Sequence, residues 1–463
     1  MAGVEVPVRK KVIFSIAEAA IGMKNASLNQ FLLFFYADVV KLAPALVGAA
    51  IAASRFWDAL TDPVMGYVSD TTRTRWGRRR PFVIGAAVPL GLSYGALFMP
   101  PRGWGDNAVF FYLLLTYGLL FTVFTVFATP YFAWGAELVR DYHERTVLVQ
   151  MRGLFAIVGG IIGAATPIWI AGRFGDQRTG FAVMAAVMGA LITAAALASG
   201  IGIRETPPPA RPRRPSLQHF FTGMRQTAAN RAFAMVFITF CLMTLAGAIA
   251  QSVHLILIKY WLAMYDFFPA LALVFALSAA VSFPLWLKLS QRIGKRRALL
   301  CALLISCVTP YGWLLMRPGA RLGMVVFFAI AGLAAGSMTL AVSSAVDLVD
   351  QDELETGERR EGAYFGLWAL GLKSTSAVGA LLGGVLLGWA GYHANTVQAP
   401  GTLLWLRVIA GPLPATMNLI GYLIFRRFPF EPADVARIQA ALEARRHAAA
   451  GDSDAAARSA ANA

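Results

Sequence analysis

Hydrophobic residues occur in twelve long runs, separated by short segments that are rich in Pro, Gly and charged residues. A helix needs about 20 mostly apolar residues to cross a membrane, and each run is close to that length or longer. The pattern therefore predicts an all-α membrane protein with twelve transmembrane helices. Their expected limits are residues 12–40, 44–69, 81–99, 108–136, 150–172, 180–203, 232–262, 267–287, 298–316, 322–349, 360–390 and 403–425.

The chain divides into two halves at a polar, proline-rich segment that follows the sixth run. The halves resemble each other, because Gly77-Arg-Arg-Arg80 follows the second run and Gly294-Lys-Arg-Arg297 follows the eighth. An internal repeat explains this, and it predicts two six-helix bundles around a central pathway. We expect an N-terminal bundle at 1–203, a cytoplasmic linker at 204–231, a C-terminal bundle at 232–427 and a cytoplasmic tail at 428–463.

Composition agrees with a membrane protein, since 57% of the residues are hydrophobic and only 14% are charged. Soluble domains usually carry about 25% charged residues, so soluble enzymes and nucleic-acid-binding proteins are poor candidates despite a net charge of +16. The three cysteines and five histidines have no disulfide, zinc or HExxH spacing. We expect the lipid bilayer as a partner, no nucleic acid, no cofactor beyond a coupling ion, and a monomer.

Basic residues predict the orientation of the chain. Most of the 41 Lys and Arg residues lie at the termini or in loops after even-numbered runs. Short loops rich in Lys and Arg stay on the cytoplasmic side of a membrane. Both termini are therefore expected in the cytoplasm, for a multi-pass protein of the cell inner membrane.

Charged residues inside the predicted spans are the candidates for function. A charge at the bilayer centre costs about 2.5 to 3.5 kcal/mol on insertion scales, so each needs a partner, water or a role. The expected spans contain six such residues of special interest: Glu18, Lys24, Arg55, Asp58, Asp62 and Lys373.

Arg55, Asp58 and Asp62 lie on one face of the second span, at i, i+3 and i+7. Two carboxylates one turn apart repel each other in low dielectric, so the pair needs a compensating cation or proton. A sodium ion at Asp58 and Asp62 with a hydroxyl from Thr61, or a proton, would make this a coupling site. A permanent salt bridge to Arg55 or Lys373 is the structural alternative.

The segment from Gly66 to Arg80, at the end of the second span, contains glycines, an acid and several arginines. Ion pairs at the cytoplasmic boundary between the bundles can favour one of two conformations of a transporter. Arginines that only anchor the loop are the alternative. The predicted gating residues are Asp70, Arg73, Arg78, Glu137 and Arg140.

Three motifs carry a family resemblance: Phe35-Tyr-Ala-Asp-Val-Val40, Arg55-Phe-Trp-Asp-Ala-Leu-Thr-Asp-Pro-Val-Met-Gly66 and Thr72-Arg-Thr-Arg-Trp-Gly-Arg78. They resemble the glycoside-pentoside-hexuronide:cation symporters, which include the melibiose permeases. The resemblance implies a major facilitator fold, alternating access and cation-coupled uptake of a sugar or glycoside. The cation site that it implies consists of Asp58, Asp62, Thr61, Thr125 and Lys373.

Substrate binding is where this sequence departs from the family. The resemblance places the family's two sugar-binding acids at Gly22 and Ala128, so both acids are missing. Lys24 in their place would favour an anionic ligand, although it could instead pair with Glu18 or extend toward the interface. The predicted substrate-binding residues are Glu18, Gly22, Lys24, Asn25, Ala128, Tyr131, Arg152 and Trp368. Aromatic residues among them could stack on a sugar or serve only in packing.

The sequence thus predicts a secondary active transporter and not an enzyme: a symporter coupled to H⁺ or Na⁺ that imports a sugar or glycoside. A lysophospholipid or another anionic amphiphile is the alternative cargo on the same fold.

Overall fold

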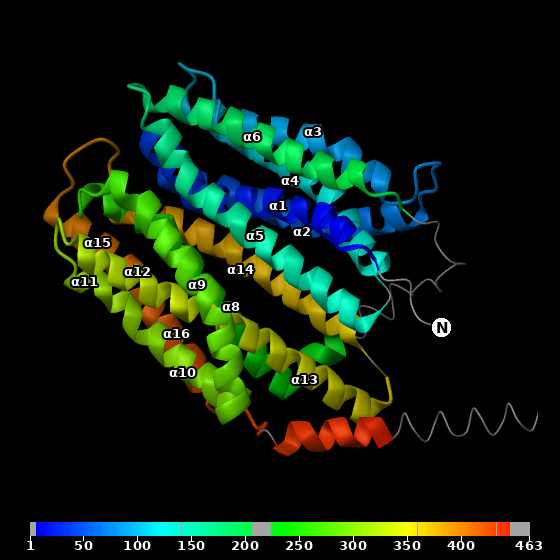
Figure 1. The fold of residues 1–463 in the computed structure, drawn as a ribbon. Coiled ribbons are helices and arrows are strands. Elements are labelled where there is room, and N and C mark those ends of the chain that lie inside the picture. Colours follow the sequence, from blue (N-terminus) through cyan, green and yellow to red (C-terminus); the bar gives the residue numbers. More distant parts are fainter. Residues whose placement is uncertain (1–5, 140, 206–223, 359, 432, 445–463) are drawn as a thin grey trace, which may run out of the picture.

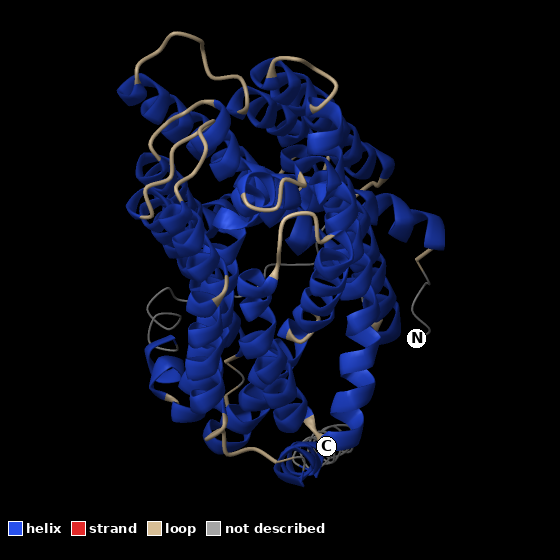
Figure 2. Cartoon of the chain, turned by 90° about the vertical axis from the view of Figure 1, so that its left-hand side faces the viewer, coloured by secondary structure: helices blue, strands red, loops and turns tan. Residues whose placement is uncertain are grey.

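A computed structural model describes the chain except residues 1–5, 140, 206–223, 359, 432 and 445–463. The described residues form helices and loops and contain no β-strand (Figure 2). Linker residues 206–223 and the gating candidate Arg140 lie outside the described residues.

The first half contains six long helices, and a short π-helix extends the first of them. They are α1 (Val8–Phe34) with η1 (Phe35–Val39), α2 (Pro44–Thr71), α3 (Arg80–Leu97), α4 (Asp106–Leu138), α5 (Tyr142–Ala171) and α6 (Gln177–Gly202). Local sequence determines their ends. The carboxylate of Asp176, for example, caps α6 by accepting hydrogen bonds from the amides of Arg178 and Thr179.

The second half contains six corresponding spans, three of which are interrupted. The helices are α8 (Arg231–Tyr260), α9 (Phe268–Ile293), α10 (Lys295–Val308), α11 (Gly312–Leu315), α12 (Arg321–Ala335), α13 (Met338–Thr356), α14 (Glu361–Trp389), α15 (Pro400–Ala410) and α16 (Pro412–Phe425). The short 3₁₀ turns η2 (Tyr265–Phe267) and η3 (Thr309–Tyr311) precede α9 and α11. Pro310 and Pro412 fall at two of the interruptions, where the missing N–H of proline weakens the helical ladder.

These helices match the twelve expected spans. Nine helices or interrupted pairs in the described part of the chain are long and apolar enough to cross a membrane, and α1, α2 and α3 complete the set. The two groups of six form two layers, with α14 of the second group beside α2 of the first (Figure 1). The expected major facilitator architecture is therefore present.

The two halves contact each other through a few helix pairs. These are α2 with α14, α5 with α9, and α1 with α8. Helical residues 433–444 follow the last span and lie near the same end of the molecule as the start of α1 (Figure 1). The side chains of Ile438 and Leu442 in this helix are buried, so it packs its apolar face against the bundle.

Glycines allow α1 and α5 to approach closely. A Cβ at Gly22 would lie 2.3 Å from the carbonyl oxygen of Ala156, and one at Gly159 would lie 2.1 Å from that of Ala19. Small residues at one-turn spacing let membrane helices pack backbone to backbone. Gly22 thus has a packing role, and the backbone of α5 occupies the space that a carboxylate side chain would need.

We predict that Gly22→Ala lowers the thermal stability of the purified protein by several degrees, because the added methyl group overpacks this contact at a cost of about 1–3 kcal/mol. Gly153→Ala on α5 is the matched control, since a Cβ there meets open space. Thermal unfolding in detergent measures both variants. Equal melting temperatures for the two variants would contradict the packing role.

Candidate cation and substrate site

Two carboxylates and two hydroxyls from α2 and α4 form the centre of the candidate cation site. Asp58 and Asp62 lie one turn apart on α2, and Asp58 is buried. The hydroxyl of Thr125 on α4 lies 2.8 Å from Oδ1 of Asp58 and 3.0 Å from Oδ1 of Asp62. The hydroxyl of Thr61 donates to the carbonyl oxygen of Asp58 at 3.1 Å. The predicted oxygen groups are therefore together in space.

Lys373 on α14 completes this cluster from the opposite half of the protein. Its Nζ lies 2.7 Å from Oδ2 of Asp58 and also pairs with Asp62. The ammonium offsets the repulsion between the two carboxylates, as a bound cation would. Of the two salt bridges considered from sequence, the one to Lys373 is present in this conformation.

The donor set fits a hard monovalent cation. Carboxylate and hydroxyl oxygens are the ligands that such ions prefer, and Asp58, Asp62, Thr61 and Thr125 supply only oxygen. The described residues contain no cluster of three or more His, Cys, Asp or Glu side chains that could hold a metal ion, so the candidate ligands here are two carboxylates and two hydroxyls.

Arg55 and Lys24 lie near the cluster but form no ion pair in the described part of the chain. Arg55 donates from Nη2 to Oδ1 of Asn29 at 2.7 Å, and its Nε is buried without a hydrogen-bond partner. Lys24 is 2% exposed, and its Nζ lies 3.2 Å from the centre of the Phe124 ring. Lys24 therefore neither pairs with Glu18 nor extends to the interface.

Glu18 has a different partner within the first half. Nε and Nη2 of Arg152 donate to Oε1 of Glu18 at 2.7 and 2.5 Å. Tyr131 packs beside this pair, with its ring 4.6 Å from that of Phe14 and its hydroxyl bonded to the Phe14 carbonyl oxygen. Glu18, Arg152 and Tyr131 are thus brought together, as a buried ion pair with an aromatic neighbour.

The other predicted substrate residues are dispersed. Trp368 is buried against Phe240, with 4.1 Å between ring centroids. Ala128 is also buried, whereas Asn25 is exposed. Their roles in substrate binding remain predictions.

Two adjoining cavities lie between the halves. The larger, about 530 Å³, is bordered by α1 and α5 on one side and by α8, α9, α12 and α16 on the other. Its lining contains many Ala, Phe, Ile and Met side chains and no Lys, Arg, Asp or Glu. The smaller, about 330 Å³, is bordered by Arg55, Tyr117, Thr244 and Ser376 together with leucine and isoleucine side chains. A larger chamber without charged residues thus adjoins a smaller one that contains the guanidinium of Arg55.

Residues shared by both linings show that the cavities are neighbours: Asn29, Met243, Gly247, Gln251 and Met338. The predicted substrate residues border neither of these two cavities. Asn29 belongs to the polar first span, and Gln251 and the cavity residue His254 are polar positions in an apolar run. A polar residue inside a span is the signal that could have identified Gln251.

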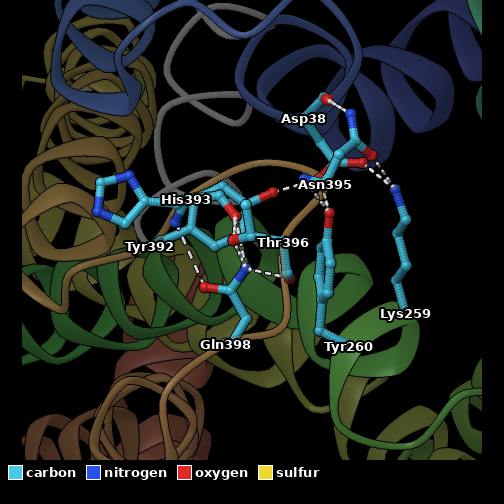
Figure 3. A network of polar contacts seen from close by, with 8 residues as sticks. All are labelled: Asp38, Lys259, Tyr260, Tyr392, His393, Asn395, Thr396 and Gln398. Atoms are coloured by element: carbon cyan, nitrogen blue, oxygen red, sulfur yellow. Dashed lines mark hydrogen bonds and ion pairs between the residues drawn. The ribbon is translucent and has the colours of Figure 1, made fainter.

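A buried network joins the halves at the end opposite the described termini (Figure 3). Asp38 in η1 is fully buried, and its carboxylate accepts contacts from Lys259, Tyr260 and Tyr392 of the second half. The side-chain amide of Asn395 donates to the carbonyl oxygen of Asp38 at 3.2 Å. The sequence analysis did not identify Asp38 as functional, although an acid inside an apolar span was the available signal.

At the end with the termini, the ion pairs of the predicted gating residues remain within the first half. Arg78 pairs with Glu137 at 2.5 Å, and Arg79 pairs with both Asp70 and Glu137 at 3.0 Å. Asp70 therefore pairs with a loop arginine, whereas Arg73 is exposed.

The second half repeats this corner of the structure. Lys295 pairs with Asp347 at 2.7 Å, at the position that corresponds to Arg78 and Glu137 in the first half. This agreement supports the internal repeat.

A family model described as MFS/sugar transport protein matches residues 13–431. The sodium-dependent lysophosphatidylcholine symporter 1-A of Danio rerio is 26% identical over 91% of this chain and 85% of its own length. The glucuronide carrier protein homolog of Escherichia coli (strain K12) is 26% identical over 91% of this chain and 92% of its own.

Solved structures show the same fold at low sequence identity. The nucleoside transporter NupG is similar with a TM-score of 0.60 and 13% identity over 92% of this chain and 99% of its own. A bacterial homolog of the human lysosomal transporter Spinster has a TM-score of 0.64 and 13% identity over 92% and 98%. The chain belongs to the MFS/sugar transport protein family and has the major facilitator fold, as a multi-pass membrane transporter related to symporters.

Proposed function

We propose that this protein is a sodium-coupled symporter that moves an amphiphilic small molecule across the cell inner membrane by alternating access, with both termini in the cytoplasm. The observation that carries the proposal is the mainly apolar cavity of about 530 Å³ beside a smaller cavity that contains Arg55 and lies near Asp58, Asp62 and Lys373. A polar head group fits the smaller chamber, and an apolar body fits the larger one.

Two kinds of amphiphile fit this division. A lysophospholipid is favoured by the named cargo of the Danio rerio relative. A glycoside or glucuronide with an apolar aglycone is favoured by the named cargo of the Escherichia coli relative and keeps the cargo predicted from sequence. A small sugar without an apolar part would leave the larger chamber unused.

Lys373 links cation binding to the contact between the two halves. Its ammonium lies between Asp58 and Asp62, so a sodium ion that binds both carboxylates must displace it. Lys373 belongs to α14 and the acids to α2, and these helices form one of the contacts between the halves. Cation binding would therefore loosen a contact that holds the halves together, which links the ion to the change of access.

The Asp38 network holds the two halves together at the end of the molecule opposite the ion pair of Arg78 and Glu137. A buried carboxylate that accepts from an ammonium and two phenols must lose these partners when the halves separate there. With the termini in the cytoplasm, this network seals the outer side in the conformation described.

We predict that Asp58→Asn reduces sodium-driven accumulation in proteoliposomes at least about tenfold, because one of two charged ligands is lost. Lysophosphatidylcholine and a glucuronide are the two cargoes to test, each with a sodium gradient and with a proton gradient. Accumulation that is driven only by a proton gradient would identify H⁺, and not Na⁺, as the coupling ion.

Asp176→Asn is the control for charge removal. Asp176 lies in the loop before α6, and its pKa is lowered to about 2, chiefly by the hydrogen bond from the Thr179 hydroxyl. It is ionised at assay pH, so this variant also removes a full charge and should transport normally. Undiminished sodium-driven uptake by Asp58→Asn would refute the coupling site.

We predict that Ala276→Trp blocks uptake of amphiphiles but leaves sodium binding intact, because the indole would fill part of the larger cavity that Ala276 borders. Uptake should fall about tenfold or more for a long-chain lysophospholipid. Leu277→Trp is the control, since Leu277 is 53% exposed on the outer surface of the helix. Normal lysophospholipid uptake by Ala276→Trp would show that the larger cavity does not hold the apolar body of the cargo.

We predict that Asp38→Asn shifts the protein toward a conformation that is open at the end opposite the termini. Electron–electron distances between spin labels at Gly175→Cys and Val397→Cys, in a background without the native cysteines, would report the separation of the halves. Both positions are exposed in loops at that end. The population at longer distance should rise about tenfold, as loss of one charged hydrogen-bond partner implies.

Asp266→Asn is the control for that measurement, because Asp266 is an exposed acid at the same end. An unchanged distance distribution in Asp38→Asn would show that the network does not hold this end closed.

A further inference from the structure

Basic side chains outnumber acidic ones around the cation site. The basic residues are Lys24, Arg55 and Lys373, and the acids are Asp58 and Asp62. The remaining membrane acid of this region, Glu18, is already paired with Arg152. At least one basic side chain of the cluster therefore has no acid to pair with, before any coupling cation binds.

Arg55 and Lys24 are the basic side chains of this cluster that have no acidic partner in the described residues. Lys373 is neutralised by direct contact with both acids, whereas neither of the other two forms an ion pair in the described residues. Lys24 is instead held against the rings of Phe124 and Phe121, at 3.2 and 5.1 Å from their centroids. Aromatic faces stabilise an ammonium but do not neutralise its charge.

Arg55 also has unused hydrogen-bonding capacity. A guanidinium offers five N–H donors in a planar fork that matches carboxylate and phosphate. Nη2 donates to Asn29, but Nε is buried without a partner. Arg55, Asn29 and Tyr117 all border the smaller cavity, so a molecule in this cavity lies beside the guanidinium.

We infer that Arg55, with Lys24 nearby, forms an anion subsite in the smaller cavity for a carboxylate, phosphate or sulfate group of the cargo. This inference rests on the proposed symport and narrows its cargo to anionic amphiphiles. The anionic group would pair with Arg55, and the apolar body would extend past Asn29 and Gln251 into the larger cavity.

The subsite also gives a physical reason for coupling. A sodium ion that displaces Lys373 adds a positive charge beside Arg55, which has no acidic partner of its own in the described residues. An anion beside Arg55 offsets this charge, so each ion favours the binding of the other, and by the same factor in both directions. Charge compensation therefore makes simultaneous loading of cation and cargo the favoured state.

Matched pairs of probes test this inference on the purified full-length protein. One pair is p-nitrophenyl β-D-glucuronide and p-nitrophenyl β-D-glucoside, which differ in a carboxylate. The other pair is a lysophosphatidic acid and the monoacylglycerol of the same chain, which differ in a phosphate. Equilibrium binding is measured with sodium and with choline as the cation, and in chloride and gluconate salts.

We predict that the charged member of at least one pair binds about tenfold more tightly than its neutral partner, and that sodium increases this preference. Lys24→Met and Arg55→Gln should reduce the preference to about threefold or less, while Lys24→Arg retains it. Lys288→Met, which removes an exposed lysine of α9 in the other half, is the control and should match the wild type.

Lys24→Met keeps an apolar side chain on the two phenylalanine rings, so its thermal unfolding should match the wild type even if Arg55→Gln is unstable. Equal affinity for both members of each pair, failure of all four probes to bind, or a preference that Lys24→Met leaves unchanged would overturn the subsite. A requirement for chloride in place of a charged cargo would also overturn it. Sodium-independent binding of every probe would instead refute the proposed symport.

Discussion

The contact of Lys373 with Asp58 and Asp62 is the interaction on which the arrangement of the two halves depends. Charges inside a membrane are costly unless they are paired, and here the two acids come from α2 and the base from α14. The pairing therefore connects the halves at the same point that offers oxygen ligands to a cation. Because an ammonium and a sodium ion cannot satisfy the same carboxylates together, this structural contact is also the target of the coupling ion in the proposed mechanism.

Helix α14 connects this contact with the closure at the opposite end. Lys373 lies in the middle of α14, and Tyr392 lies in the loop that follows it. Tyr392 contacts Asp38 of the first half, so the helix is attached to that half at two levels. Backbone contact between Gly48 and Gly384 brings α2 and α14 close together. A change at the cation site is therefore transmitted to an element that also holds the seal.

The same physical rule separates structural charges from functional ones. Glu18 with Arg152, and Arg78 with Glu137, pair within one half and can move with it as a unit. Asp38 with Lys259, and Asp58 with Lys373, pair across the halves and must exchange partners when the halves move. Arg55 and Lys24 have no acidic partner in the described residues, and Arg55 borders the smaller cavity, where the proposed anion subsite lies. The role of a buried charged residue is thus indicated more by the half in which its partner lies than by its own residue type.

Sequence alone predicted the twelve spans, the repeat and a candidate cation site. Membrane insertion imposes a strong length and polarity pattern, and Asp58, Thr61 and Asp62 lie within about one helical turn of each other. The structure decided what depends on side chains from separate helices. It paired Glu18 with Arg152, placed Lys24 on Phe124, and brought Asp38 to Lys259 and Tyr392, although these residues are far apart in the chain. It also showed that Gly22 is a packing residue and that the cavities are lined by Asn29 and Gln251. Periodicity assigns a residue to a face of its own helix, but the neighbour of that face is set by helix packing across the bundle.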